Sequence, residues 1–409
     1  MSDNRASLPI PPQSALERSA RLLAQLRAAL HGAGGWLPFD AYMQQALYAP
    51  GLGYYTGQAD QFGDFGSSSD FVTAPELTPL FGRAVAAQVA QAMDLAGTRR
   101  VVEFGAGTGA LAAQLLGELA GRGCAPEEYV IVELSGALKH RQMETIRTRA
   151  PELADRVRWW TALPESFDAV VVGNEVLDAM PVKLLRRGES GWLERGVGQD
   201  GDDLVWIDRP TPLAPPDPEA GALPAGTVTE IHPQALAFIR TLAERLDRGI
   251  ALFLDYGFPQ HEYYHPQRHM GTLRAHYRHR ALDDVLLWPG LVDITAHVDF
   301  TAIALAAQDA GLDVLGYTSQ ANFLLNCGLL DLLAQDFVAG PLPAAPESAA
   351  AICATLDAPA SSLYLRQTAA VNKLLGESEM GELFKVIALG RGIAAPLRGF
   401  ARGDRTHTL

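Results

Sequence analysis

The sequence has little that would cross-link the chain. Its 409 residues include three cysteines, Cys124, Cys327 and Cys353, which lie far apart and form no CxxC pair. This spacing argues against a disulfide framework and against a cysteine-based zinc site. We therefore expect reduced thiols.

Long apolar runs and an excess of basic residues are also missing. No stretch of about 18 consecutive apolar residues occurs, so no membrane span is expected. The chain has 33 Lys and Arg against 47 Asp and Glu, a formal net charge of −14, which argues against a broad nucleic-acid-binding surface. An acidic pocket for a cationic substrate stays compatible with this charge. The start, MSDNRASLPIPPQ, has no hydrophobic signal region and a single arginine, so we expect a cytoplasmic protein.

From about residue 100 onward, apolar strand-like runs alternate with helical patterns. RRVVEFG, EYVIVEL, FDAVVVGN and IALFLDYG are examples of such runs. Continuous apolar strands separated by helices are typical of a parallel sheet covered on both faces, so the pattern predicts an α/β fold with a mostly parallel sheet. We expect an N-terminal helical region over residues 1–98 and a core over 99–400. Two polar stretches, 188–226 and 258–297, are predicted to be insertions in that core.

A glycine-rich loop, EFGAGTG, follows the first strand of the core. Gly105, Gly107 and Gly109 allow a tight turn and a close approach of backbone to ligand, although a tight strand–helix connection alone is the simpler alternative. The spacing is GxGxG and not the GxGxxG of most dinucleotide sites. Glu103 precedes the loop, where it would repel phosphate but suit an ammonium group. Glu133 ends the second strand, where it can accept hydrogen bonds from ribose hydroxyls. Together these residues favour S-adenosyl-L-methionine over NAD.

The stretch VVGNEVLDAMPV places polar side chains at the end of a buried strand. Burying Asn174, Glu175 and Asp178 is unfavourable unless a polar or cationic group meets them. Asp178 could cap a following helix. Alternatively, the three residues wait for a ligand, because ligands of doubly wound sheets collect at the carboxyl ends of the strands.

The sequence resembles the class I S-adenosylmethionine-dependent methyltransferases, and more closely the MidA-type methyltransferases. That family includes the mitochondrial arginine methyltransferase that assists respiratory complex I assembly. The matching stretches are YAPGLGYYT, DFVTAPELTPLFG, EFGAGTG, GNEVLDAMPV, GTLRAHYRHR, DITAHVDFTAIA and MGELFKVIALG, which run in order from about residue 36 to 391. The approach to DFVTAPE, GSSSDF, is less compact than is usual in the family.

The resemblance implies a Rossmann-like, mostly parallel seven-stranded sheet with helices on both faces and an N-terminal helical lid. It implies that Glu175 and Asp178 act as paired acids on a guanidinium substrate and that Asn174 contacts the cofactor. Thr73 and Glu76, in DFVTAPE, are candidates for cofactor binding, although their spacing also fits a capping box. Tyr54 and Tyr55 either stack on adenine or pack the lid.

The stretch from 258 to 297 holds six of the ten histidines. His261, His265 and His269 recur every four residues, but Pro259 and Pro266 interrupt any helix there, so no metal site is predicted. The stretch is either a solvated basic loop or a substrate-side lid, and as a basic surface it could also dock an acidic partner. His297, at its end, is a candidate proton acceptor.

Three functions fit these residues. The first is a protein arginine methyltransferase, with a respiratory-complex subunit as a possible substrate. The second is a small-molecule methyltransferase, and the third is an assembly factor that binds the cofactor without catalysis. A homodimer is compatible with the apolar first helix.

Overall fold

The computed structural model describes residues 8–57, 73–278, 280–282, 284–338 and 359–409. The stretch GSSSDF and the first residues of DFVTAPE, residues 66–72, lie outside these residues, as does Cys353. Within the described residues, no helix is long and apolar enough to cross a membrane.

The main feature is a large sheet whose strands run in the order β15-β16-β10-β5-β2-β3-β4, with the two-residue β14 paired to β10. Strands β10, β5, β2, β3 and β4 are parallel to their neighbours in this group, and β16 is antiparallel to both β10 and β15. The bounds are β2 Arg100–Phe104, β3 Glu128–Val132, β4 Val157–Trp160, β5 Phe167–Asn174, β10 Leu246–Phe258, β14 Val298–Asp299, β15 Asp313–Ser319 and β16 Phe384–Arg391. The predicted α/β fold with a mostly parallel sheet is confirmed.

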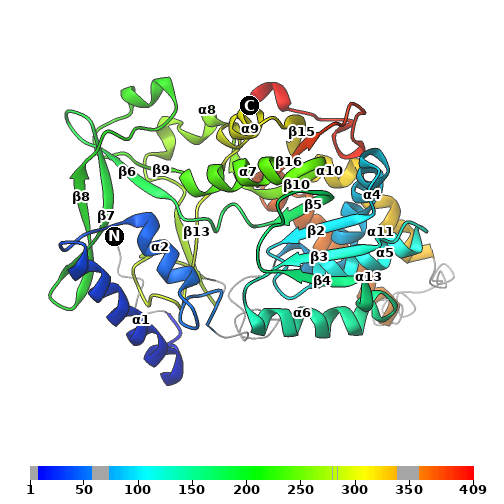
Figure 1. The fold of residues 1–409 in the computed structure, drawn as a ribbon, viewed down its shortest axis with the longest axis horizontal. Helices are drawn as coiled ribbons and strands as arrows, with labels where there is room; N and C mark the ends of the chain where they lie inside the picture. Colours follow the sequence, from blue (N-terminus) through cyan, green and yellow to red (C-terminus); the bar gives the residue numbers. More distant parts are fainter. Residues whose placement is uncertain (1–7, 58–72, 279, 283, 339–358) are drawn as a thin grey trace, which may run out of the picture.

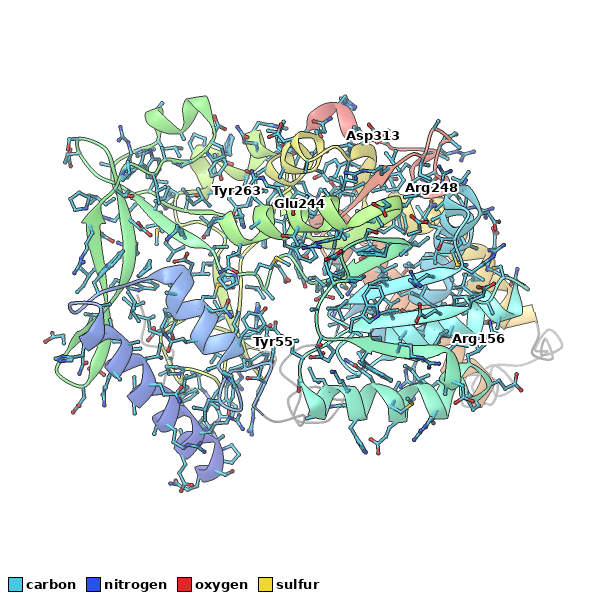
Figure 2. All side chains as sticks on the ribbon, in the orientation of Figure 1. Tyr55, Arg156, Glu244, Arg248, Tyr263 and Asp313 are labelled. Atoms are coloured by element: carbon cyan, nitrogen blue, oxygen red, sulfur yellow. The ribbon has the colours of Figure 1, made fainter. Side chains whose placement is uncertain are left out.

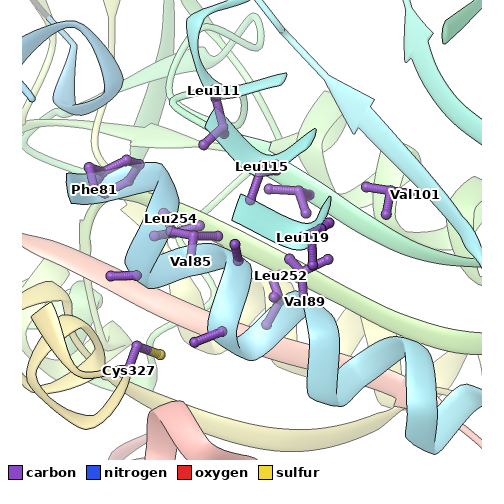
Figure 3. Packing of buried hydrophobic residues seen from close by; sticks show 14 of the residues in the cluster. Phe81, Val85, Val89, Val101, Leu111, Leu115, Leu119, Leu252, Leu254 and Cys327 are labelled. Atoms are coloured by element: carbon purple, nitrogen blue, oxygen red, sulfur yellow. The ribbon is translucent and has the colours of Figure 1, made fainter. Parts of the chain in front are cut away.

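Alternating side chains on the strands build two cores, one on each face of this sheet. Val170 and Val172 of β5 face one cluster, and Val171 between them faces the other. The first face is covered by α4 (Pro79–Ala96), α5 (Ala110–Gly121), α10 (Gln320–Asn326), α11 (Leu329–Val338), α13 (Pro359–Leu375) and α14 (Met380–Leu383). The second face is covered by α7 (Pro233–Arg245) and α9 (Phe300–Asp309). The helix α6 (Gly136–Arg149) contacts α5. Figure 3 shows Phe81, Val85 and Val89 of α4 packed between α5 and the side chains of β10.

A second lobe stands beside the sheet (Figure 1). It contains an antiparallel sheet of β1 (Leu37–Pro38), β6 (Lys183–Arg187), β7 (Trp192–Asp200), β8 (Asp203–Pro210) and β9 (Val228–Ile231). It also contains the three-stranded sheet of β11 (Arg274–Tyr277), β12 (Arg280–Leu282) and β13 (Asp293–Thr295). The N-terminal helices α1 (Gln13–Gly32) and α2 (Phe39–Tyr48) also belong to this lobe, whereas the short α8 (Gln260–Tyr263) contacts β10 and α9.

The second lobe has a hydrophobic core of its own. Leu26 and Phe39 from the N-terminal helices, Val182 beside β6, and Ala275 and Ile294 from the third sheet belong to one buried cluster. Residues of α1 and α2 and of both stretches predicted as insertions therefore pack around shared apolar side chains, whereas α4, in the same predicted N-terminal region, packs on the large sheet.

Candidate active site

A pocket of about 670 Å³ lies between the large sheet and the second lobe. Its walls come from the ends of β2, β3, β5 and β10, from α2, and from β11 and β13. Pockets at the carboxyl ends of parallel strands are the usual ligand sites of doubly wound sheets. Among the residues predicted from the sequence, those in the lining are Thr73, Glu76, Glu103, Gly105, Gly107, Glu133, Asn174, Glu175 and Asp178.

The glycine loop forms the floor of one end of the pocket. Gly105, Gly107 and Gly109 have φ values of 65°, 51° and 85°, a left-handed conformation that L side chains rarely adopt. A Cβ on Gly107 would meet nothing within 4 Å, whereas one on Gly105 would lie 2.8 Å from Val176. The backbone at Gly107 is thus open to a ligand. Gly109 is not in the lining, and it begins α5 against Gln142.

Gln142 ties this loop to the predicted ribose acceptor. Its Nε2 donates to the carbonyl of Gly107 at 3.1 Å and to Glu133 Oε2 at 3.3 Å, and its Oε1 accepts from Trp159 Nε1 at 2.8 Å. Glu133 Oε1 accepts the N–H of Ser135 at 2.8 Å. These bonds fix the direction of the Glu133 carboxylate. Gln142 was not predicted as a site residue, because a single glutamine in a largely polar helix does not indicate its hydrogen-bond partners.

Glu103 is almost fully buried below the loop, and its carboxylate accepts a 2.6 Å hydrogen bond from the hydroxyl of Tyr129. Burial raises the pKa of Glu103 to about 7, although the bond from Tyr129 lowers it. A cationic group in the pocket would favour the charged carboxylate, which fits the ammonium partner predicted for this residue.

The capping box predicted for Thr73 and Glu76 is wrong. Thr73 precedes α3 (Ala74–Leu77), but its side chain makes no capping hydrogen bond. Glu76 instead accepts a hydrogen bond from the hydroxyl of Thr108. It thereby connects α3 to the glycine loop, and both residues line the pocket.

The strand β5 ends in a turn and not in a helix. Residues 176–180 have no helical hydrogen bonding, so the alternative in which Asp178 caps a helix is wrong. Glu175 has a φ of 53°, one of the few positive values for a residue other than glycine. Asn174 Nδ2 donates to Glu175 Oε1 at 2.9 Å, while the buried Oδ1 of Asn174 has no hydrogen-bond partner among the described residues. That acceptor is available to a donor on a ligand.

Acidic side chains gather at this second end of the pocket. Glu175, Asp178 and Asp293 line it, and Asp255 lies buried beneath the turn. Burial and then the charge of Asp255 raise the pKa of Glu175 to about 8, and the same two causes raise that of Asp178 well above its usual value. Burial raises the pKa of Asp255 to about 7. Asp255 and Asp293 were not predicted as site residues, although they lie in the apolar run IALFLDYG and in the family-like stretch DITAHVDF.

Aromatic rings enclose the acidic end. Tyr48 and Tyr55 stack with their centroids 5.4 Å apart, and the hydroxyl of Tyr55 donates to Asp293 at 2.7 Å. In Figure 2, Tyr55 lies on the side of the second lobe that faces the large sheet. Tyr54 is fully buried, packs edge-on against Tyr55 and is absent from the lining. Of the two tyrosines predicted to cover the site, one faces the pocket and one packs the lobe.

His297 is not brought into the pocket. Its ring stacks on Tyr256 at 5.8 Å, and Tyr256 itself lines the pocket, so His297 lies behind that ring. Burial and the nearby Arg268 lower the pKa of His297 to about 3, and its Nδ1 has no partner. A neutral histidine behind a tyrosine has no direct route to a substrate here, and its predicted role as a proton acceptor is without geometric support.

The residues fit S-adenosyl-L-methionine. The open backbone at Gly107 can approach the cofactor, the unpartnered Oδ1 of Asn174 can accept from an amino group, and Glu133 is oriented beside the loop. A glycine loop after the first strand, an acid after the second and a parallel sheet in which one strand next to the edge, β16, is antiparallel to both of its neighbours together define the class I methyltransferase fold.

Comparison with known proteins identifies the family. Residues 82–318 match the family of putative S-adenosyl-L-methionine-dependent methyltransferases, and the chain belongs to that family. A crystal structure of a protein from Burkholderia thailandensis bound to S-adenosyl-homocysteine is 54% identical, with a TM-score of 0.89, and the match covers 98% of this chain and 100% of that one. The chain is accordingly an S-adenosyl-L-methionine-dependent methyltransferase.

Curated relatives match more distantly. Protein arginine methyltransferase NDUFAF7 of Mus musculus is 30% identical over 323 residues, which cover 70% of each chain. The homologue of Caenorhabditis elegans is 28% identical over 315 residues, covering 70% of this chain and 72% of the relative. Both are named as mitochondrial proteins. This finding contradicts the cytoplasmic location predicted from the sequence. That prediction rested on the absence of a hydrophobic signal region, which does not distinguish a cytoplasmic protein from relatives of this kind.

Proposed function

We propose that this chain is a protein arginine N-methyltransferase in which Glu175 and Asp178 hold the substrate guanidinium. The observation that carries the proposal is the acidic end of the pocket. Glu175 and Asp178 face one cavity, whose described lining residues include no Lys or Arg. Buried carboxylates in such a group raise one another's pKa, so a cation that enters is bound favourably.

Guanidinium matches this arrangement better than a compact ammonium would. It is planar, stays protonated at neutral pH and presents several N–H donors that carboxylates accept in pairs. The stacked rings of Tyr48 and Tyr55 add an aromatic wall, against which a guanidinium can lie flat. No group of three or more His, Cys, Asp or Glu among the described residues is arranged to hold a metal ion. The acids are therefore better suited to an organic cation.

The chain's residues have three tasks in the reaction. When bound, S-adenosyl-L-methionine supplies a methyl group from its sulfonium. Glu175 and Asp178 orient the guanidinium so that one nitrogen faces that methyl group, which is the main requirement of an in-line displacement. As the new N–C bond forms, the nitrogen loses a proton, and one of the two carboxylates accepts it. Tyr48, Tyr55 and Tyr256 exclude water from the charged groups.

The relatives support a protein as the substrate, since those with 28–30% identity are named as protein arginine methyltransferases. The sequence resemblance extends the proposal to a subunit of a respiratory complex.

The test uses tritiated S-adenosyl-L-methionine, the purified protein and an extract of cells that lack it. We expect label in a protein band that co-fractionates with a respiratory complex, recovered as methylarginine after acid hydrolysis. Glu175→Gln should reduce the labelling at least ~100-fold while its affinity for S-adenosylhomocysteine stays within about 3-fold of wild type. Label confined to small metabolites, or to another amino acid, would refute the proposal.

A further inference from the structure

Asp255, at the end of β10, binds the turn that carries the paired acids. Its Oδ2 accepts the N–H groups of Val176 at 3.0 Å, Leu177 at 2.8 Å and Asp178 at 3.3 Å. Its Oδ1 accepts the N–H of Tyr256 at 2.9 Å. One carboxylate oxygen thus accepts three successive backbone N–H groups. Because the turn does not continue into a helix, these N–H groups have no helical carbonyl to bond, and Asp255 satisfies them instead.

The turn needs such a hold because its backbone is strained. Glu175 has a φ of 53°, a left-handed conformation that residues with a Cβ rarely adopt. Its N–H donates to the carbonyl of Leu254 at 2.9 Å, directly before Asp255 in β10. In the parallel pairing of these strands, Leu254 lies opposite Asn174. The end of β10 thus determines the conformation of the turn that follows β5.

Asp255 itself does not face the substrate. It is 1% exposed and is absent from the pocket lining, and both of its oxygens accept backbone N–H groups. Glu175 and Asp178, by contrast, are in the lining, and Asp178 Oδ1 is buried without a hydrogen-bond partner. The carboxylates of the turn and the carboxylate beneath it therefore have different tasks.

We propose that Asp255 is a positioning residue, which holds the 174–178 turn so that Glu175 and Asp178 present their carboxylates to the substrate. The role of Glu175 and Asp178 in binding substrate rests on the proposed function. The effect of Asp255 on the conformation of the turn, however, can be measured without any substrate.

Asp255 also acts through its charge. The titratable groups around Glu175 are Asp178 in the same turn, Asp255 and Tyr256 on β10, and Asp293 on β13. Among them, Asp255 contributes the largest electrostatic increase in the pKa of Glu175, after burial. Neutralising Asp255 should therefore lower that pKa, an effect that a purely structural residue would not have.

The first experiment is hydrogen–deuterium exchange of the protein bound to S-adenosylhomocysteine. In Asp255→Ala, the amides of residues 176–178 lose their acceptor and should exchange about 10-fold faster or more. In Asp255→Asn, the amide oxygen can still accept these N–H groups, and exchange should stay near the wild-type rate. Unchanged exchange in Asp255→Ala would overturn the positioning role, whatever the substrate is.

The second experiment measures methyl transfer to the protein acceptor that wild-type enzyme labels in the extract. Asp255→Ala should lower kcat about 100-fold with affinity for S-adenosylhomocysteine within about 3-fold, and Asp255→Asn should recover much of that loss. In Asp255→Asn, the pH at which kcat/KM reaches half its plateau should fall by roughly 1 unit, because Glu175 ionises more readily.

Glu230→Gln is the matched control. Glu230 is a buried acid outside the pocket that also accepts two backbone N–H groups, from Thr272 and Leu273. It should leave the pH midpoint unchanged. An equal shift in both variants, or none in Asp255→Asn, would overturn the electrostatic role of Asp255. If wild-type enzyme forms no methylarginine, the proposed function fails, while the exchange experiment still decides the hold on the turn.

Discussion

At the scale of single residues, the folded protein disfavours the ionised form of the Glu175 side chain. Burial and then Asp255 raise its pKa from 4.5 to about 8. Between those two values the folded chain binds more protons than the unfolded chain. The stability that this group contributes is therefore present below about pH 4.5 and is lost as the pH rises through about 8.

Glu175→Gln should consequently stabilise the ligand-free protein at high pH. We expect the free energy of unfolding to rise by roughly 1–2 kcal/mol at pH 8.5, a value reduced for solvent screening of a half-buried group, and by much less at pH 5. Urea unfolding followed by circular dichroism at both pH values measures this. The exposed Glu165→Gln should show no such difference. A loss of stability at pH 8.5 would contradict the electrostatic account.

Gly107 supplies a second residue-scale prediction. Gly107→Val places a side chain in the open space that a ligand would fill and strains a φ of 51°. Binding of S-adenosylhomocysteine should fall at least ~100-fold by calorimetry. Gly97→Val is the control, because Gly97 has a φ of 67° and open space around it but ends α4 outside the pocket. It should lose similar stability and keep its binding. Equal loss of binding in both variants would show that strain alone is responsible.

The sequence predicted those site residues whose chemistry conflicts with their surroundings. Glycines in a strand–helix loop and carboxylates after a valine run are unusual enough to be recognised locally. Asp255 follows an equally apolar strand, but its partners are the N–H groups of residues 176–178, which lie some eighty positions earlier. His297 was predicted from its residue type and its place at the end of the 258–297 stretch. The stacking contact that puts it behind Tyr256 is one that no local pattern indicates.

At the scale of elements, α6 is joined to the glycine loop and to β4 through Gln142. Gln142→Leu keeps the volume of the side chain but leaves Trp159 Nε1 and the carbonyl of Gly107 without their partner. We expect the affinity for S-adenosylhomocysteine to fall about 10-fold, because the loop and Glu133 lose their common anchor. Gln88→Leu, an equally buried change on α4 far from the loop, should destabilise the protein without altering that affinity. Equal affinities of the Gln142→Leu variant and wild type would refute the anchoring role.

The central strands β5 and β10 of the large sheet could be predicted because each contains a continuous apolar run. The sheets of the second lobe could not be, since their strands are short, partly polar and paired across the chain. Leu37 of β1 lies opposite Val197 of β7, and β6 joins β9 across the polar stretch between them. The sheet starts before the predicted insertion at 188–226, because its strand β6 already begins at Lys183. Long-range pairing, and not local composition, determines where these elements start and end.

At the scale of the whole molecule, the pocket belongs to both lobes. The glycine loop and Glu133 come from the large sheet, whereas Tyr48, Tyr55 and Asp293 come from the second lobe, whose core is separate. The predicted division at residue 98 and the predicted homodimer stay predictions. The two cores nevertheless imply that cofactor binding and closure around the substrate depend on different parts of the chain.

This separation gives a last prediction. Leu26 is fully buried in the core of the second lobe, and Leu26→Ala should destabilise that lobe by about 2–4 kcal/mol through the cavity it leaves. At temperatures where the large sheet stays folded, methyl transfer should fall at least ~10-fold, since Tyr48 and Tyr55 are no longer held, while affinity for S-adenosylhomocysteine changes less than about 3-fold. Leu115→Ala, in α5 and in the core of the large sheet (Figure 3), should reduce both together. If Leu26→Ala also lowers cofactor affinity in proportion to activity, the two lobes unfold as one unit and the second lobe is part of the cofactor site.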